Sequence, residues 1–335
     1  MHVLVAGDHF VTPTLLANAV TERVPTGLTL STMTLEWPKV PFGPVAEVLE
    51  ASGTEEAMIA ELSGATIAVS QMAPFTRRVI EASTDLELIV VCRGGPVNVN
   101  LEAAAERGVH VVSTPGRNAV AAAEHAIALM LAAMRRVPER TASMQAGEWR
   151  GDEYGFDTCG RELDGLTVGL VGYGAIGRRV ARILRAFNAD VLVHDPYANA
   201  ADVTHGRLVE LDELLADAAV LSLHARLTDE TRHLIDADTL RTVRPGLVLV
   251  NTARGGLVDH DAVVAALHDG TLGAVGLDVY DPEPPAPDDP IRTAPRTVLT
   301  PHLAGATKET ALRAASMSAD AVARFVQDKL TAPLR

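Results

Sequence analysis

The chain has 335 residues, 47% of them hydrophobic, and a formal net charge of −14. This length is sufficient for two domains with full cores, and the acidic charge, spread along the chain, disfavours nucleic acid and anionic membranes as partners. Two cysteines are too few for a disulfide framework and lack metal-ligand spacing, so we expect a reducing compartment and no metal. We expect a cytoplasmic protein, because "MHVLVAGDHF" is typical of a first strand, not of a signal peptide, and the longest apolar stretch, 119–134, is shorter than a membrane span.

The first part of the sequence alternates short apolar runs with helical segments. This alternation predicts a parallel sheet that is covered by helices on both faces. Its strands are expected near Val3–Ala6, Thr66–Ser70, Glu87–Val91 and His110–Ser113. A long helix is then predicted from Ala119 to Ala146, before a glycine-rich polar segment that leads into Leu166.

A second α/β series follows Leu166, and the same reasoning predicts a second doubly wound domain. Its strands are expected near Thr167–Val171, Asp190–His194, Val220–Leu223, Leu247–Asn251, Ala274–Asp278 and Val298–Thr300. A last helix, near Lys308–Lys329, comes after this series has closed and could pack on the first domain. Ligands of such sheets bind at the carboxyl ends of the strands, so we expect the functional residues there.

The stretch "TVGLVGYGAIG" places three glycines directly after an apolar strand, at Gly172, Gly174 and Gly177. In a strand–turn–helix unit the first glycine permits the turn, the second lets a pyrophosphate approach the main chain, and the third lets helix and strand pack closely. The helix N-terminus then stabilises the phosphate charge. Glycine turns after strands are common, however, so this motif alone leaves an ordinary turn about equally possible.

The next apolar strand, Ala189–Asp195, ends in an acidic residue. A dinucleotide-binding unit has at this place a carboxylate that accepts the hydroxyls of the adenosine ribose. Asp195 would repel a 2′-phosphate, so NAD is the predicted cofactor. A phosphate-binding P-loop requires Lys-Ser or Lys-Thr after its last glycine, and Arg178-Arg179 stands here instead.

Three polar residues lie at or just beyond the ends of apolar strands of the second series: Arg254, Glu283 and His302. Singly, each has an ordinary interpretation: an arginine on a glycine turn, a solvated glutamate in a proline-rich loop and a cap at a strand end. Together with a dinucleotide site, they favour hydride transfer at a hydroxyl carbon next to a carboxylate. The arginine would hold the acid, the histidine would carry the proton, and the glutamate would tune the histidine.

The sequence resembles the D-isomer-specific 2-hydroxyacid dehydrogenases, and its cofactor half is similar to phosphoglycerate dehydrogenases. The resemblance rests on "GLVGYGAIGRRVA", "LSLHARLTDET", "LVNTARGGLVD", "GLDVYDPEP" and "LTPHLAGAT", which occur in the family's order. It implies an NAD-dependent oxidoreductase, a D-2-hydroxyacid dehydrogenase or 2-ketoacid reductase. It also implies a Rossmann NAD-binding domain at 116–304, a flavodoxin-like substrate domain at 1–115 plus 305–335, and a homodimer.

The resemblance also implies residue roles. Arg254 would bind the substrate carboxylate and carbonyl, His302 would be the general acid/base, and Glu283 its hydrogen-bonded partner. Asp278 would reach the nicotinamide amide. The implied cofactor-binding residues are Gly172, Gly174, Ala175, Ile176, Gly177, Asp195, His224, Thr228, Thr252, Ala253 and Asp278.

Departures from the family pattern limit the choice of substrate. The loop whose main chain would hold the substrate carboxylate reads "RGGPVN", so Arg93, Gly94 and Gly95 are the expected substrate-binding residues. Arg93 could bind a second anionic group of the substrate, or it could pair with an acid of the protein. Phosphoglycerate is disfavoured because Ser70 stands where phosphoglycerate-specific members have arginine. Formate is disfavoured because Glu283 stands where formate dehydrogenases have glutamine.

An alternative function belongs to another class, an NAD-sensing corepressor or interaction protein. Such proteins share the dehydrogenase fold and keep the three catalytic residues, but they usually carry a long disordered tail. The sequence has no such tail after its last predicted helix, which favours the enzyme acting on a small 2-hydroxy or 2-keto acid.

Overall fold

The structure, a computed structural model, describes residues 1–331. Contacts along the chain define two compact units. Unit 1 comprises residues 1–117 and the chain from residue 306 onward, and unit 2 comprises residues 118–305. Each unit is a parallel β-sheet between helices, which confirms the predicted α/β fold class.

Unit 1 is a doubly wound sheet in the order β2-β1-β3-β4-β5, with every neighbouring pair parallel. This is the flavodoxin-like strand order. The strands are β1 (His2–Gly7), β2 (Thr29–Thr34), β3 (Ile67–Ser70), β4 (Leu88–Val91) and β5 (His110–Ser113). The helices are α1 (Pro13–Arg23), α2 (Glu55–Glu61), α3 (Arg77–Ala82), α4 (Leu101–Glu106) and α11 (Lys308–Thr331).

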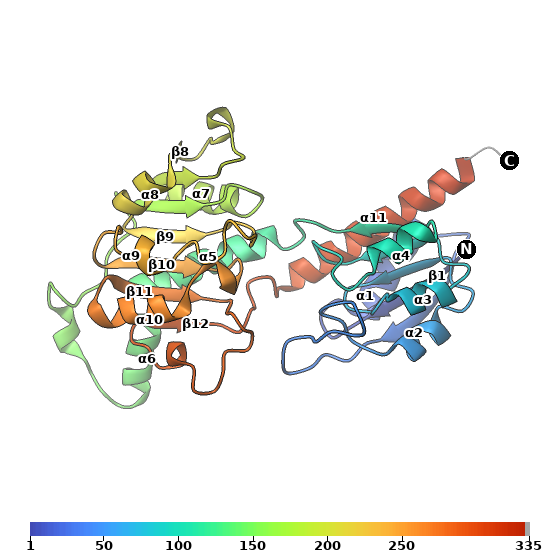
Figure 1. Cartoon of the computed structure of the whole chain (residues 1–335), viewed down its shortest axis with the longest axis horizontal. Coiled ribbons are helices and arrows are strands. Elements are labelled where there is room, and N and C mark those ends of the chain that lie inside the picture. The colour runs from blue at the N-terminus through green and yellow to red at the C-terminus, as the bar shows by residue number, and fades with distance from the viewer. Residues whose placement is uncertain (332–335) are drawn as a thin grey trace. The chain divides into compact units, whose positions relative to one another are not determined.

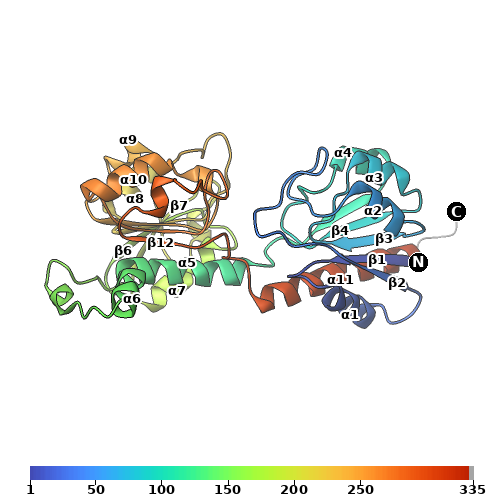
Figure 2. The same cartoon turned by 90° about the horizontal axis from the view of Figure 1, so that it is seen from below.

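The two faces of this sheet are covered by different helices (Figure 2). Helices α1 and α11 pack on one face, and α2, α3 and α4 pack on the other. The central strands β3 and β4 are buried along their whole length. The edge strand β2, with the sequence TLSTMT, is half polar and partly exposed, and it was missing from the predicted elements because it lacks an apolar run.

Unit 2 has the strand order β12-β11-β10-β9-β6-β7-β8, again all parallel (Figure 1). Its strands are β6 (Thr167–Val171), β7 (Asp190–His194), β8 (Arg207–Leu208), β9 (Val220–Leu223), β10 (Leu247–Asn251), β11 (Leu272–Leu277) and β12 (Thr297–Leu299). Its α-helices are α5 (Ala119–Met134), α6 (Val137–Gln145), α7 (Gly177–Ala186), α8 (Leu211–Asp217), α9 (Ala237–Leu240) and α10 (His260–Asp269). Short 3-10 helices lie at Gly151–Tyr154, Ala200–Asp202, Gly255–Leu257 and Pro290–Arg292.

The order in which the chain adds strands to this sheet changes direction between β6 and β9, although the two strands are parallel. Successive strands run outward from β6 to β8 on one side and from β9 to β12 on the other, which is the Rossmann order. Ligands of such sheets bind at the reversal point, outside the carboxyl ends of the strands. The glycine turn after β6 lies at this reversal point.

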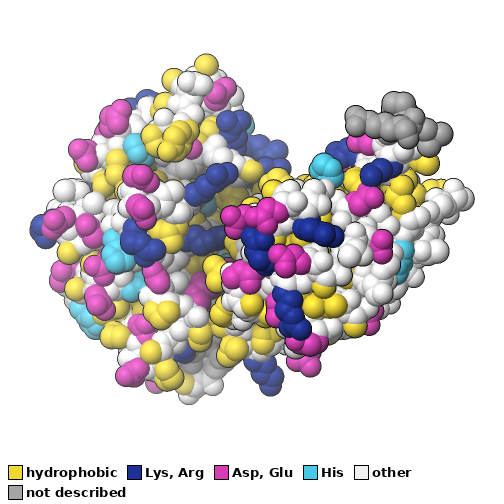
Figure 3. Space-filling model, turned by 45° about the vertical axis from the view of Figure 1, so that its right-hand side comes forward, with side chains coloured by type: hydrophobic (Ala, Val, Ile, Leu, Met, Phe, Trp, Pro, Cys, Tyr) yellow, Lys and Arg dark blue, Asp and Glu magenta, His cyan; other side chains and the backbone are white. Residues whose placement is uncertain are grey.

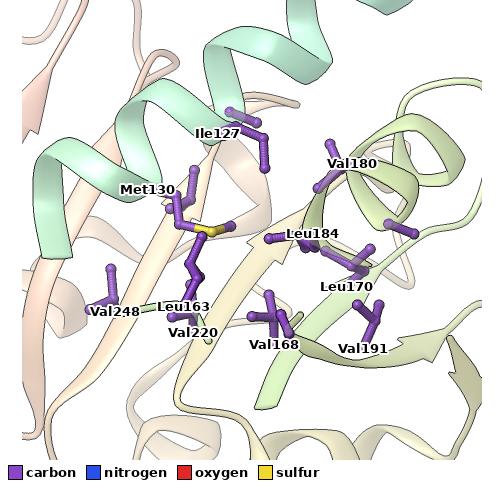
Figure 4. Packing of buried hydrophobic residues seen from close by; sticks show 14 of the residues in the cluster. Ile127, Met130, Leu163, Val168, Leu170, Val180, Leu184, Val191, Val220 and Val248 are labelled. Carbon is purple, nitrogen blue, oxygen red and sulfur yellow. The ribbon is translucent and has the colours of Figure 1, made fainter. Parts of the chain in front are cut away.

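Helices α5 and α7 bury one face of this sheet (Figure 4). Met130 of α5 and Leu184 of α7 are fully buried there, against Val168, Leu170 and Val220 of the strands. Helices α8, α9 and α10 bury the opposite face with a second apolar cluster. A core on both faces leaves the strand ends as the accessible edge of the sheet.

The predicted helix from Ala119 to Ala146 is wrong as one continuous element. It divides into α5 and α6 at Arg136, whose φ of 49° is left-handed. Pro138 explains the break, because proline has no N–H to donate and its ring would clash with the carbonyl one turn earlier in a continuous helix. The sequence itself contains this signal, because Pro138 stands inside the predicted helix.

The surface carries mixed charge. Figure 3 shows acidic and basic side chains interspersed over the face in view. Among residues 1–331, no helix combines the length and the apolar character required to cross a bilayer. The apolar stretch at residues 119–134 is α5, whose apolar side chains are mostly buried within unit 2.

Candidate active site

Two of the three glycines in the turn after β6 are required by close packing, and the remaining one, Gly174, is open. Gly172 has a φ of 98°, and a Cβ there would lie 2.7 Å from the carbonyl carbon and oxygen of His224. A Cβ at Gly177 would lie 2.1 Å from the carbonyl oxygen of Gly172. A Cβ at Gly174, in contrast, would meet nothing within 4 Å. The open main chain at Gly174 is suited to the close approach of a phosphate group.

Helix α7 begins three residues after this open position, at Gly177. Ile176 is its N-cap and provides no side-chain cap, while Ala175 before it is exposed. A helix N-terminus without a side-chain cap favours a bound anion through its N–H groups and dipole. The turn and the helix therefore fit the pyrophosphate of a dinucleotide.

Asp195 lies beside the glycine turn, directly after β7. Its Oδ2 accepts a hydrogen bond of 2.7 Å from the N–H of Tyr173, and its Oδ1 accepts one of 2.9 Å from the N–H of Tyr197. The first of these bonds joins the carboxylate to the turn itself. A negative charge held at this place suits a ribose with free hydroxyls and opposes a 2′-phosphate.

His224 and Thr228 lie in the loop after β9, on the other side of the reversal point. The N–H of His224 donates to the carbonyl oxygen of Val171 at 2.7 Å, and its Nε2 shares a hydrogen bond of 3.0 Å with Ser222. Burial lowers the pKa of His224 to about 4, so its ring is neutral at neutral pH. Thr228 is exposed, and its N–H donates to the hydroxyl of Thr231 at 2.8 Å.

The turn after β10 is held by a buried side chain, Asn251. Its amide donates to the carbonyl oxygen of Arg254 at 2.8 Å and accepts from the N–H of Ala253 at 3.0 Å. Arg254 is exposed, and one of its guanidinium nitrogens donates to the carbonyl oxygen of Ala253 at 2.6 Å. The hydroxyl of Thr252 is buried without a hydrogen-bond partner among the described residues, as expected for a group that meets a ligand.

Glu283 and His302 form a hydrogen-bonded pair in unit 2. The Nδ1 of His302 lies 2.8 Å from Oε2 of Glu283, while Oε1 of Glu283 accepts from the N–H of Tyr280 at 3.0 Å. The side chain of His302 is 50% exposed and that of Glu283 is 24% exposed. The histidine therefore remains accessible, although one of its nitrogens is occupied.

The pair and Arg254 influence one another electrostatically. The hydrogen bond that His302 donates to Glu283 raises the pKa of His302, against the opposing effects of burial and of the Arg254 charge. Burial alone would raise the pKa of Glu283, but the hydrogen bond and charge of His302 and the charge of Arg254 hold it below its usual value. The arrangement is thus a carboxylate that stabilises an imidazolium, close to a cation.

Asp278, at the end of β11, is fully buried. Its Oδ1 accepts from the hydroxyl of Thr300 at 2.6 Å and from the N–H of Leu303 at 2.8 Å, and its Oδ2 accepts from the N–H of Ala304 at 2.8 Å. Burial would raise the pKa of Asp278, but the polar groups beside its carboxylate, first His125 and Thr300, hold it below the usual value. Its carboxylate therefore holds the loop that follows β12.

The predicted substrate-binding residues of unit 1 lie after β4. The guanidinium of Arg93 forms an ion pair with Glu50 and lies 3.6 Å from the sulfur of Met72. Of the two interpretations of Arg93, this contact favours pairing with an acid of the protein. A Cβ at Gly95 would meet nothing within 4 Å, and one at Gly94 would meet only Pro115, at 3.9 Å. The main chain of these glycines is thus not covered by neighbouring atoms.

Sequence reasoning missed several residues that shape the site: Asn251, Tyr280, Thr300 and the role of His125. Asn251 and Thr300 end apolar strands, just before Arg254 and His302, and this position was the only available signal. Within residues 1–331, no group of three or more His, Cys, Asp or Glu side chains is arranged to hold a metal ion.

Comparison with known proteins shows the family of the chain. Residues 127–304 match the family described as D-isomer specific 2-hydroxyacid dehydrogenase, NAD binding domain. The chain is 36% identical over 263 residues to D-3-phosphoglycerate dehydrogenase of Archaeoglobus fulgidus, covering 78% of this chain and 49% of that protein. It is 39% identical over 251 residues to glyoxylate reductase of Aeropyrum pernix, covering 73% of this chain and 75% of that protein. The chain belongs to the D-isomer-specific 2-hydroxyacid dehydrogenase family.

A solved structure supports the assignment over both units. The apo-structure of D-lactate dehydrogenase from Escherichia coli has a TM-score of 0.74 at 27% identity, covering 98% of this chain and 97% of that one. The chain spans about half the length of the phosphoglycerate dehydrogenases that it matches. Unit 2 carries the family's NAD-binding domain, which confirms the predicted family and NAD as the cofactor.

Proposed function

We propose that the protein is an NAD-dependent D-2-hydroxyacid dehydrogenase that also reduces 2-ketoacids. The observation that supports this most strongly is the hydrogen bond of 2.8 Å between Nδ1 of His302 and the carboxylate of Glu283. The pair lies in a unit that carries an NAD-binding domain, with Arg254 close enough to shift both pKa values. An acid/base, its charged partner and a cation are the groups that this reaction requires.

In the reducing direction, His302 acts as the general acid. Bound NADH supplies the hydride to the carbonyl carbon. Because Nδ1 is bound to Glu283, Nε2 is the nitrogen that donates a proton to the ketone oxygen. Glu283 stabilises the imidazolium and orients its ring. Arg254 binds the substrate carboxylate and stabilises negative charge that develops on the oxygen.

We propose that unit 1 is the substrate domain and unit 2 the cofactor domain. The main chain of Arg93, Gly94 and Gly95 binds the carboxylate of the 2-hydroxy acid, while the Arg93 side chain is held by Glu50. The proposed cofactor ligands are Gly172, Gly174, Ala175, Ile176, Gly177, Asp195, His224, Thr228, Thr252, Ala253 and Asp278.

We also propose that the protein is located in the cytoplasm. Fractionation of cells that express a tagged full-length chain tests this location directly.

Steady-state reduction of a panel of 2-ketoacids with NADH tests the proposed activity. We expect turnover of at least one of them, and a loss of about 10²–10⁴-fold in kcat for His302→Asn, the usual size for a general acid. Tight NADH binding without turnover of any ketoacid would instead favour the NAD-sensing interaction protein. A matched control is His268→Asn, because His268 is exposed at the end of α10.

We propose that the protein is a homodimer that associates through unit 2. The supporting observation is a set of exposed aromatic side chains just after α6: Trp149 is 83% exposed, Tyr154 95% and Phe156 93%. Large apolar side chains exposed together are typical of surfaces that a partner covers. Light scattering should give twice the monomer mass for the parent. The double variant Trp149→Glu with Phe156→Glu should have the mass of a monomer. A monomeric parent at micromolar concentration would contradict the proposal.

A further inference from the structure

A histidine outside the proposed catalytic set contacts the loop that carries His302. His125 lies on α5, and its Nε2 is 3.0 Å from the hydroxyl oxygen of Thr300 and 3.4 Å from Oδ1 of Asp278. Its side chain is 23% exposed, whereas that of Asp278 has no exposed area. The side chains of His125, Thr300 and Asp278 are named here the α5 network.

The donors and acceptors of the α5 network can be assigned from chemistry. Asp278 is ionised, because its pKa lies below the usual value, and it can only accept hydrogen bonds. The hydroxyl of Thr300 therefore donates its single proton to Oδ1 of Asp278, at 2.6 Å. The Thr300 oxygen must then accept from Nε2–H of His125. His125 thus donates inward, through Thr300, to a buried negative charge.

This buried charge holds the backbone on both sides of the reacting imidazole. The carboxylate of Asp278 accepts from the N–H groups of Leu303 and Ala304, and the carbonyl oxygen of Asp278 accepts from the N–H of His302 at 2.8 Å. His302 itself has a φ of 55°, in the left-handed region that non-glycine residues seldom adopt. Such a conformation persists only where surrounding contacts enforce it.

We propose that His125 is a positioning residue for the reaction: through Thr300 and Asp278 it holds the backbone that aims His302 at Glu283 and at the substrate. The inference rests on the proposed function for its kinetic part only. Besides Glu283, the charged groups that influence the His302 ring are Asp278 and Arg254. His125 touches none of the reacting groups, so its effect is indirect.

The first experiment replaces His125 by leucine and by glutamine. His125→Leu removes the donor, and we expect kcat for ketoacid reduction to fall roughly tenfold, the effect of losing one hydrogen bond within a buried charged network. His125→Gln places an amide N–H near the position of Nε2, and we expect it to restore most of the activity. His268→Leu, the same substitution at an exposed histidine, should leave kcat unchanged. Equal kcat in His125→Leu and the parent, or a glutamine variant as impaired as the leucine variant, would overturn the proposal.

A second measurement does not depend on turnover. The titration of the His302 ring, followed by NMR of the histidine C–H signals, should have a lower midpoint in His125→Leu than in the parent, because the ring is held less well against Glu283. Glutamine should restore the midpoint. If the parent reduces no ketoacid but this midpoint moves, the proposed function fails and the positioning role stands. An unmoved midpoint in a folded variant overturns the role, whatever the activity.

Thr300→Val keeps the shape of the side chain and provides a second route, including the case in which His125→Leu does not fold. Because the two residues act in series, the double variant Thr300→Val with His125→Leu should lose no more activity than Thr300→Val alone. Losses that multiply would show that the two residues act independently, which overturns the relay through Thr300.

Discussion

The substitution Glu283→Gln tests the charge that acts on His302. The carboxylate accepts from two donors, one oxygen from Nδ1 of His302 and the other from the N–H of Tyr280. A glutamine side chain has one acceptor oxygen for these two donors and carries no charge. Whichever donor takes that oxygen, the imidazolium loses its stabilising anion, so the pKa of His302 should fall.

The size of the effect follows from the geometry. A hydrogen bond to a charged group contributes about 1.5–3 kcal/mol when it is shielded from water. The side chain of His302 is half exposed, so screening reduces this to about 1 kcal/mol, which corresponds to roughly a fivefold change in an equilibrium constant. Only the protonated ring donates, so the variant should lose about fivefold in kcat/KM at high pH and much less at low pH.

The assay is kcat/KM for ketoacid reduction against pH, for the parent and for Glu283→Gln. In the parent, activity should fall as pH rises through the raised pKa of His302. The variant should show the same fall at lower pH. A variant whose activity is lower by a constant factor at every pH, with an unmoved midpoint, would refute the charge coupling and leave Glu283 only an orienting role.

Four further substitutions address the cofactor site, the substrate loop and the fold. Asp195→Ser should shrink the ratio of kcat/KM for NADH to that for NADPH by about tenfold, because the ribose hydroxyls of NADH lose the charged carboxylate to which they donate. An unchanged ratio would exclude Asp195 from the ribose site. Arg93→Ala should change kcat/KM less than about twofold with both glyoxylate and oxaloacetate, since Glu50 neutralises the guanidinium at a partly exposed site; a selective loss with oxaloacetate would show that Arg93 binds its distal acid. Gly177→Ala should lower the free energy of unfolding, measured in urea titrations, by about 1–3 kcal/mol, which is the cost of overpacking. Gly174→Ala should leave the free energy of unfolding unchanged and weaken only the binding of NADH. Equal losses of stability in the two variants would contradict the assignment of Gly174 as the open glycine.

Sequence reasoning predicted the central strands of both sheets because they are continuous apolar runs, buried on both faces. It missed β2 and β8, which lie at sheet edges and are partly polar. It also extended one helix through Arg136, where Pro138 ends the hydrogen-bonded ladder. Edges and helix ends depend on single residues, and apolar patterning describes them less well than it describes a core.

The placement of catalytic candidates at strand ends followed from topology alone. In a parallel sheet all carboxyl ends lie at one edge, so polar residues that follow separate strands can be expected near one another. Arg254, Glu283 and His302 were selected in this way. The side chains that orient them could not be selected, because their partners are distant in sequence: His125 and Thr300 are 175 positions apart.

Asp278 shows which step is missing between a position and a role. Its place at the end of β11 could be read from the sequence, but the direction of its carboxylate depends on the pairing of β11 with β12. Leu277 pairs with Leu299, and this register brings Asp278 next to Thr300. A slip of one residue would turn Thr300 to the opposite face of the sheet and remove the hydroxyl from the carboxylate. His302 follows Thr300 by two residues in the sequence. Strand pairing, a property of the folded sheet, therefore decides both the hydrogen bonds of Asp278 and the position of the histidine whose loop they hold.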